Sequence, residues 1–245
     1  MPNQNAARTE RGTALVAGTL YLLTFATSIP TLQLYRPLRD HPDFVLGAGS
    51  ATGVTWGALL EVVLAVSCAG TAVSLFPVVK RHSERAALGF VASRVVEASL
   101  VLVGVLSLLA ILQLRQGAPV ADPAALTATA RALLALYDGT FLLGQSLMPV
   151  MSALCLGSAL YRSRLVPRVI PALGLAGAPL LLASDVAVLC GVYPQGSALA
   201  GLAALPIAAW ELALGVRLVV TGFQPSALPT PLDAEALAPG SAALR

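Results

Sequence analysis

Six long runs of apolar residues divide the chain, and turns or polar stretches separate them. Crossing about 30 Å of hydrocarbon takes about 20 apolar residues in an α-helix. The six runs that meet this length are 13–34, 55–79, 86–114, 138–160, 169–192 and 197–220. The pattern therefore predicts an all-α, polytopic integral membrane protein whose six-helix transmembrane domain covers residues 13–223.

The two ends of the chain lie outside this domain. A cleaved signal peptide is the competing explanation of the first run, but its apolar region is only about 7–15 residues long. The run 13–34 is longer, so we expect an uncleaved first helix preceded by a short segment, 1–12. From Gln224 onward the chain is rich in Pro, Ala and Ser and has no periodicity, which predicts a disordered tail over 224–245.

The longest connection, 115–137, has an amphipathic pattern. Asp122 followed by Pro123 is typical of a helix N-cap with proline at the first helical position. Apolar residues then recur along one helical face, namely Leu126, Leu133, Leu134 and Tyr137. We expect a helix that lies on the membrane surface or leads into the fourth span. A lid over the bundle is a third alternative.

The composition excludes an ordinary soluble domain. The 245 residues are 57% hydrophobic and 11% charged, against about 25% charged residues in soluble domains. The net charge of +3 does not indicate nucleic-acid binding, because the basic residues form short clusters between spans and no single patch. Arginine outnumbers lysine fourteen to one, which together with the abundant alanine indicates a GC-rich bacterial genome.

The basic clusters predict the orientation in the membrane. With six spans both termini share one side, and that side collects ten basic residues: Arg8, Arg11, Lys80, Arg81, Arg85, Arg162, Arg164, Arg168, Arg217 and Arg245. The other side has four, which are Arg36, Arg39, Arg115 and Arg131. Cytoplasmic loops retain Lys and Arg. We therefore predict a multi-pass protein of the bacterial inner membrane with both termini cytoplasmic.

A stripe of small residues opens the second span. Gly49, Gly53 and Gly57 repeat every four positions. Small residues let helix backbones approach closely in a bilayer, where no hydrophobic force drives helices together. The stripe predicts helix packing within the chain, and a homodimer through these glycines is the sharper alternative.

Five ionisable residues lie inside the predicted spans: Glu61, Arg94, Glu97, Asp185 and Glu211. A charge near the centre of a membrane helix costs about 2.5–3.5 kcal/mol on insertion scales, so such side chains face one another, a cavity or backbone groups. Arg94 and Glu97 are three residues apart and share a helix face. The helical rise places Glu211 at the depth of Arg94. We predict an intramembrane network of Arg94, Glu97 and Glu211 that joins the third helix to the sixth.

The remaining carboxylates have no buried cation within reach. One arginine faces four carboxylates, so one or two of them are expected to be protonated at neutral pH, and Glu61 and Asp185 are the candidates. Gln145 and Asp138 are expected to join them around an outward-facing polar pocket. The alternative is structural, because a buried polar cluster can simply fix helix register, as it does in coiled coils.

Catalytic motifs are absent from the sequence. It has no His-Glu-x-x-His, no Gly-x-Ser-x-Gly and no phosphate-binding glycine loop, and both histidines lie outside the spans. The three cysteines have no metal-type spacing. We therefore predict no catalytic residue, metal or cofactor, and an enzyme is the least supported class.

Four stretches, taken in order, resemble one family: Arg11–Leu22, Arg94–Ala98, Tyr161–Arg168, and Glu211–Leu214 before a final Gly222. From about residue 8 to 223 the chain is similar to the uncharacterised bacterial membrane family called domain of unknown function 4386. The resemblance implies a multi-helix inner-membrane protein whose motif positions include Arg94, Glu97 and Glu211. Glu61 and Asp185 match none of these motifs. The family has no assigned activity, so no catalytic role follows from it.

Two function classes stay open. A non-catalytic accessory, sensor, or lipid- or partner-binding membrane protein needs the fewest special features, and the sequence slightly favours it. The alternative is a proton- or ion-coupled transporter of a small solute that uses the buried carboxylates. No repeat between the two halves of the chain supports a transporter built from inverted repeats.

Overall fold

The computed structural model describes residues 4–117 and 122–224, and every regular element in them is helical. The first span consists of α1 (Gln4–Ser28), α2 (Thr31–Leu34) and α3 (Arg36–Asp40), and a short 3-10 helix, η1 (Phe44–Leu46), follows it. The single-helix spans are α4 (Ala51–Lys80), α5 (Glu84–Gly117), α9 (Val169–Leu189) and α10 (Ala198–Val220). The fourth span is a continuous rod of α6 (Pro123–Phe141), the π-helical η2 (Leu142–Leu147), α7 (Met148–Ser152), the π-helical η3 (Ala153–Gly157) and α8 (Ser158–Ser163).

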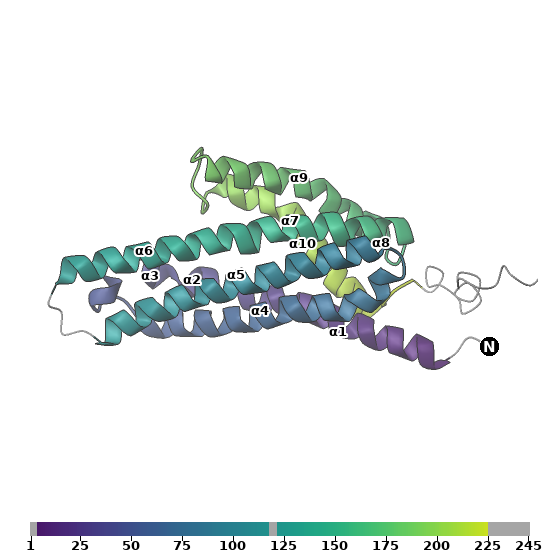
Figure 1. Cartoon of the computed structure of the whole chain (residues 1–245), viewed down its shortest axis with the longest axis horizontal. Helices are drawn as coiled ribbons and strands as arrows, with labels where there is room; N and C mark the ends of the chain where they lie inside the picture. Colours follow the sequence, from purple (N-terminus) through teal and green to yellow (C-terminus); the bar gives the residue numbers. More distant parts are fainter. Residues whose placement is uncertain (1–3, 118–121, 225–245) are drawn as a thin grey trace, which may run out of the picture.

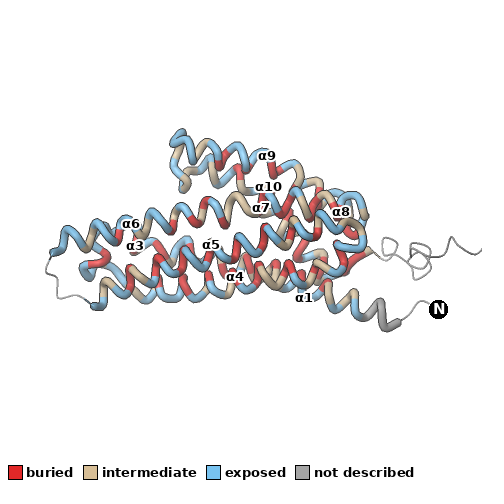
Figure 2. The backbone as a smooth tube through the Cα atoms, viewed as in Figure 1, coloured by how far each residue is buried: buried red, intermediate tan, exposed pale blue. Residues whose placement is uncertain are grey.

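In the described part of the chain, six helical stretches are long and apolar enough to cross a membrane, which confirms the predicted fold class. They pack as a closed ring in which each span contacts the next. α1 packs on α4, α4 on α5, α5 on the fourth span, the fourth span on α9, α9 on α10, and α10 returns to α1. Buried residues follow the inward faces of these helices (Figure 2). The ring therefore has an interior to which every span contributes.

The two ends of the described chain meet at the same end of the bundle (Figure 1). There the guanidinium group of Arg11, on α1, donates hydrogen bonds to the carbonyl oxygens of Leu218, Val219 and Val220 at 2.7–3.2 Å. These carbonyls close α10 and have no partner within their own helix. Arg11 thus ties the start of the first span to the end of the last.

Two predicted boundaries need correction. The run 13–34 is not one helix, because Pro30 lacks the N–H that would continue the hydrogen-bond ladder, and α1 ends at Ser28. The chain then turns into α2 and α3. The fifth span ends at Leu189 and not at 192, since Gly191 adopts a left-handed conformation with φ of 72° just after the helix.

The amphipathic segment leads directly into the fourth span. The carboxylate of Asp122 accepts hydrogen bonds from the amides of Ala124 and Ala125 at 3.0 and 3.1 Å, which confirms the predicted N-cap. α6 then continues without a break past position 138, where the span was predicted to begin. The predicted disordered tail, 224–245, lies outside the described residues except for Gln224.

The end of the bundle opposite the termini extends beyond α9 and α10 (Figure 1). At 1.5 Å per residue, α5 is about 51 Å long and α9 about 32 Å, so the longer helices project past the shorter pair. A second apolar core fills this outer end and includes Tyr35, Phe44, Ile111 and Tyr137. This outer core is a cluster separate from the larger one that includes Tyr21 and Trp210.

Arg115 holds the loop that enters α4. Its guanidinium group donates to the carbonyl oxygens of Phe44, Gly47, Ala48 and Gly49 at 2.6–2.9 Å. It also lies over the ring of Phe44, 4.5 Å from its centroid. Four backbone acceptors on one side chain fix this loop in a single conformation.

The glycine stripe packs against the chain's own short helices. A Cβ atom on Gly53 would lie 3.0 Å from the carbonyl oxygen of Leu34, and one on Gly57 would clash with the ring of Tyr35. Gly49 has a left-handed φ of 68° in the loop before α4. The close approach that the stripe predicts is therefore made within the chain. A homodimer through these glycines stays a prediction, and it would have to displace α2.

Cys190 tests the predicted orientation, because it is exposed and follows α9 at the end opposite the termini. If both termini are cytoplasmic, a membrane-impermeant maleimide added to intact cells labels Cys190, and Cys190→Ser abolishes the signal. Cys68 is buried and should react only after denaturation. Labelling that requires permeabilised cells would place the termini outside.

Candidate functional site

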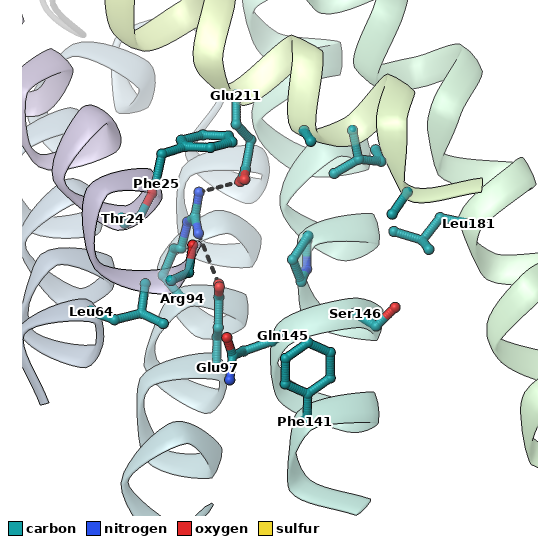
Figure 3. A pocket seen from close by; sticks show the side chains of 15 residues that line it. Thr24, Phe25, Leu64, Arg94, Glu97, Phe141, Gln145, Ser146, Leu181 and Glu211 are labelled. Carbon is teal, nitrogen blue, oxygen red and sulfur yellow. Dashed lines mark hydrogen bonds and ion pairs between the residues drawn. The ribbon is translucent and has the colours of Figure 1, made fainter. Parts of the chain in front are cut away.

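A cavity of about 190 Å³ lies inside the ring, and all six spans contribute to its wall (Figure 3). Its lining residues are Thr24, Phe25, Ser28, Leu64, Arg94, Glu97, Phe141, Gln145, Ser146, Pro149, Leu181, Ala204, Ile207, Ala208 and Glu211. We call it the central cavity. A water molecule occupies about 30 Å³ in the liquid, so the space suits a few waters or a solute of a few heavy atoms.

Three charged side chains of the central cavity form one ionic cluster, the Arg94 triad of Arg94, Glu97 and Glu211. Nη1 of Arg94 lies 2.9 Å from Oε2 of Glu97, and Nη2 lies 2.6 Å from Oε1 of Glu211. Arg94 is 1% exposed, whereas the side chain of Glu211 is 13% exposed. Charge-assisted hydrogen bonds of this kind are the strong ones. The triad joins α5 to α10 through Arg94 and Glu211, the two residues that the sequence places at a common depth.

The guanidinium group of Arg94 also contacts α1 and α4. Its central carbon lies 4.9 Å from the ring centroid of Tyr21 and 5.7 Å from that of Phe90. The thiol of Cys68 lies 3.9 Å from Nη1 of Arg94 and 3.6 Å from Oε1 of Glu97. The cation is therefore enclosed by side chains from four spans.

Sequence reasoning did not identify the aromatic and thiol partners of Arg94. Phe90 carried a usable signal, because it precedes Arg94 by four residues and shares its helix face. Tyr21 and Cys68 come from other spans, and their depth alone does not say which way they face. Nothing in the sequence distinguishes them from ordinary packing residues.

The fourth span departs from α-helical geometry beside the cavity. Two π-helical segments, η2 and η3, flank α7, which contains Pro149. Proline removes an amide donor from the ladder, and π-helical insertions in α-helices occur frequently at functional sites. η2 supplies Gln145 and Ser146 to the wall of the central cavity.

The structure does not bring the four side chains predicted for an outer pocket together in one cavity. Glu61 is 1% exposed and accepts a hydrogen bond from the phenol of Tyr137 at 2.6 Å. Asp185 accepts one from Ser146, also at 2.6 Å. Gln145 lines the central cavity, while Asp138 forms an ion pair with an arginine further out. One oxygen of Glu61 and one of Asp185 are buried with no hydrogen-bond partner in the described chain.

A second cavity of about 450 Å³, the outer cavity, lies between α2, α3, α6 and the turn after α9. Its lining residues are Thr31, Leu32, Tyr35, Arg39, Tyr137, Asp138, Phe141, Pro194, Gln195 and Gly196. Nη2 of Arg39 and Oδ1 of Asp138 are 2.6 Å apart, and both side chains are partly exposed. The rings of Tyr35 and Tyr137 meet edge-on with centroids 5.5 Å apart. This cavity combines a polar rim with aromatic walls.

Neither histidine belongs to these cavities. Burial of the ring, with Arg81 as the second cause, lowers the pKa of His82, so this side chain is neutral at physiological pH. Within the described ranges, no three His, Cys, Asp or Glu side chains are grouped so that they could hold a metal ion. The charged groups at the central cavity are those of the Arg94 triad.

The comparisons with known proteins give one match. A family model described as a domain of unknown function (DUF4386) matches residues 16–222, most of the chain. The resemblance seen in the sequence motifs is thereby confirmed. No curated protein and no solved structure matches.

We expect Arg94→Ala to reduce strongly the amount of folded protein in membranes. The substitution leaves the buried Glu97 and the partly buried Glu211 without their cation, and removing one partner of a buried pair typically costs about 3–5 kcal/mol. Adding Glu211→Gln should restore part of the loss, because it removes one of the uncompensated charges. Yield and thermal stability of the detergent-solubilised protein measure both effects.

Arg85→Ala is the matched control, since Arg85 is exposed on the same helix. It should leave yield and stability within the range of the unmodified protein. If Arg94→Ala accumulates and unfolds like the Arg85 variant, the triad has no structural role.

Proposed function

The chain belongs to the DUF4386 family, a domain family of unknown function, and we propose that it moves protons or small cations through its six-helix bundle. In this proposal the carboxylates of the central cavity are the exchange site. The protein is a multi-pass membrane protein, so a site inside the ring lies between two aqueous compartments.

The excess of carboxylate over cation at the central cavity is the observation on which the proposal rests. The triad sets two carboxylates against one guanidinium group, which leaves one negative charge uncompensated when both are ionised. An unpaired charge in a membrane interior is costly. A proton or a bound cation removes that cost, and its exchange is then a functional step.

The shape of the bundle supports the same proposal. All six spans line the cavity, so a small change in any one of them alters its access. The fourth span contains two π-helical segments and a proline beside the cavity, and such interruptions are where helices bend. Irregular backbone at membrane depth is typical where it lines a cavity.

A non-catalytic accessory role is the second candidate. One specific observation favours it: both terminal nitrogens of Arg94 are occupied by carboxylates of the same chain. With only Nε of Arg94 left without a partner in the described chain, such a cluster needs no ligand and can serve only to fix the register of α5 against α10. In that case the surplus charge is neutralised by a permanent proton and no exchange occurs.

Reconstituted liposomes separate the two candidates. With an imposed proton or cation gradient, the purified protein should produce a flux above that of protein-free liposomes, read with an internal pH-sensitive dye or a cation indicator. Glu97→Gln removes one of the two exchanging carboxylates, and we expect it to lower the flux at least tenfold. Glu61→Gln should also lower it, since Glu61 is hydrogen-bonded to Tyr137, which lines the outer cavity.

Glu84→Gln is the control for this measurement. Glu84 is an exposed carboxylate at the start of α5 that pairs with Lys80 at the surface, and its replacement should leave the flux unchanged. All variants are compared only where size-exclusion profiles match. A folded protein with no flux would instead support the accessory role.

A further inference from the structure

We propose that the outer cavity is the entry to the central cavity, that it admits small organic cations of the alkylammonium class, and that the ring of Phe141 closes the passage between the two. The inference rests on the proposed function and deepens it by naming the route and the substrate class. Its evidence is the shared wall, the charge and the aromatic lining of the two cavities.

Phe141 is the one described residue that lines both cavities. In Figure 3 its ring lies beyond Gln145 on the side of Glu97 away from Arg94. This is the direction of the outer end, because α5 runs from Arg94 through Glu97 toward that end. The ring therefore stands between the Arg94 triad and the outer cavity.

The position of Phe141 in the chain couples it to the irregular part of the fourth span. It is the last residue of α6, and η2 begins at the next residue. Oriented so that both its ends are satisfied, the amide of Gln195 donates to the carbonyl oxygen of Asp138 and accepts from the amide of Leu142, each at 3.2 Å. The turn after α9 thus holds the junction from which Phe141 projects, and a change in that turn moves the ring.

The charge along this route selects cations over anions. Two arginines, Arg39 and Arg94, face three carboxylates in the two linings, namely Asp138, Glu97 and Glu211. Glu61, which is expected to be protonated, accepts a hydrogen bond from Tyr137 behind the wall of the outer cavity and adds no charge to either lining. Arg39 and Asp138 balance each other at the outer cavity, so the negative surplus lies at the Arg94 triad, where an anion would meet repulsion.

The aromatic lining selects organic cations over strongly hydrated inorganic ones. Tyr35, Tyr137 and Phe141 line the outer cavity, and Phe25 lines the central one. Aromatic faces attract ammonium groups and are the recurrent means of recognising alkylated ones. The outer cavity falls in the usual size range of ligand sites, about 300–1,000 Å³. The central cavity is smaller, which limits the cation to a few heavy atoms.

Thiol accessibility tests the route without requiring transport. Ala208 lines the central cavity on α10, and Ala208→Cys in a Cys190→Ser background places a reporter there. Two impermeant reagents of similar size are added to the side on which Cys190 reacts: the trimethylammonium-ethyl and the sulfonato-ethyl methanethiosulfonates. The same background without Ala208→Cys gives the rate due to Cys68 and Cys155, which is subtracted.

We expect Phe141→Ala to raise the rate of the cationic reagent at least tenfold, and Phe141→Trp to lower it. The anionic reagent should react at least tenfold more slowly than the cationic one in every variant. Leu143→Ala is the control, because Leu143 is exposed two residues further along, and it should not change the rate. If Phe141→Ala lowers the yield, Phe141→Leu gives a smaller increase in the same direction.

An unchanged rate in the Phe141 variants overturns the gate, and equal rates for the two reagents overturn the cation selectivity. The result is independent of the liposome flux. Accelerated cationic labelling in a protein that shows no flux leaves the entry route standing and rejects the proposed function. A flux of tetramethylammonium that the Phe141 variants do not change supports the proposed function and rejects the entry route.

Discussion

The structure depends on the need to neutralise one buried cation in a hydrocarbon environment. A guanidinium group at membrane depth is costly, and here the cost is met by partners from several spans. Arg94 binds Glu97 on its own helix and Glu211 on α10, and it lies against the ring of Tyr21 from α1. Lipid supplies no hydrophobic force that would hold these helices together. The directed contacts of Arg94 therefore fix the relative rotation and height of α1, α5 and α10, and the cavity is the space left between them and the remaining spans.

The sequence predicts those features of this arrangement that depend only on how deep a residue lies in the membrane. Hydrophobic length locates the spans, and helical rise places Glu211 level with Arg94. Helical periodicity adds that Arg94 and Glu97 share a face. The triad follows from these facts together with the cost of isolated charges. The same reasoning grouped Glu61 and Asp185 in one outer pocket, but their partners turned out to be Tyr137 and Ser146. Depth does not state in which direction around the helix axis a neighbour lies.

Local interruptions of helical geometry were the second kind of feature that pattern alone did not supply. Pro30 ends α1 early, and the short helix α2 that follows brings Tyr35 against Gly57. The glycine stripe thus acquires a partner from within the chain, which its spacing could not identify. The π-helical segments around Pro149 are another case. A hydropathy profile is the same for an α-helix and a π-helix of equal composition, yet the extra residue in each π turn decides whether Gln145 and Ser146 face the cavity.

A structural role and a functional role for the triad are linked by the same contacts. Glu211 lies at the cavity, more exposed than Arg94, and its bond to Arg94 is the ionic link between α5 and α10. A cation that binds Glu211 competes with Arg94 for that carboxylate, and a proton placed on it weakens the same link. Either event changes how firmly α10 is held against α5, and a ligand shifts a conformational equilibrium by its difference in affinity for the two states. Under the proposed function, the surplus carboxylate would therefore couple occupancy of the cavity to helix packing, which a triad with equal charges would not do.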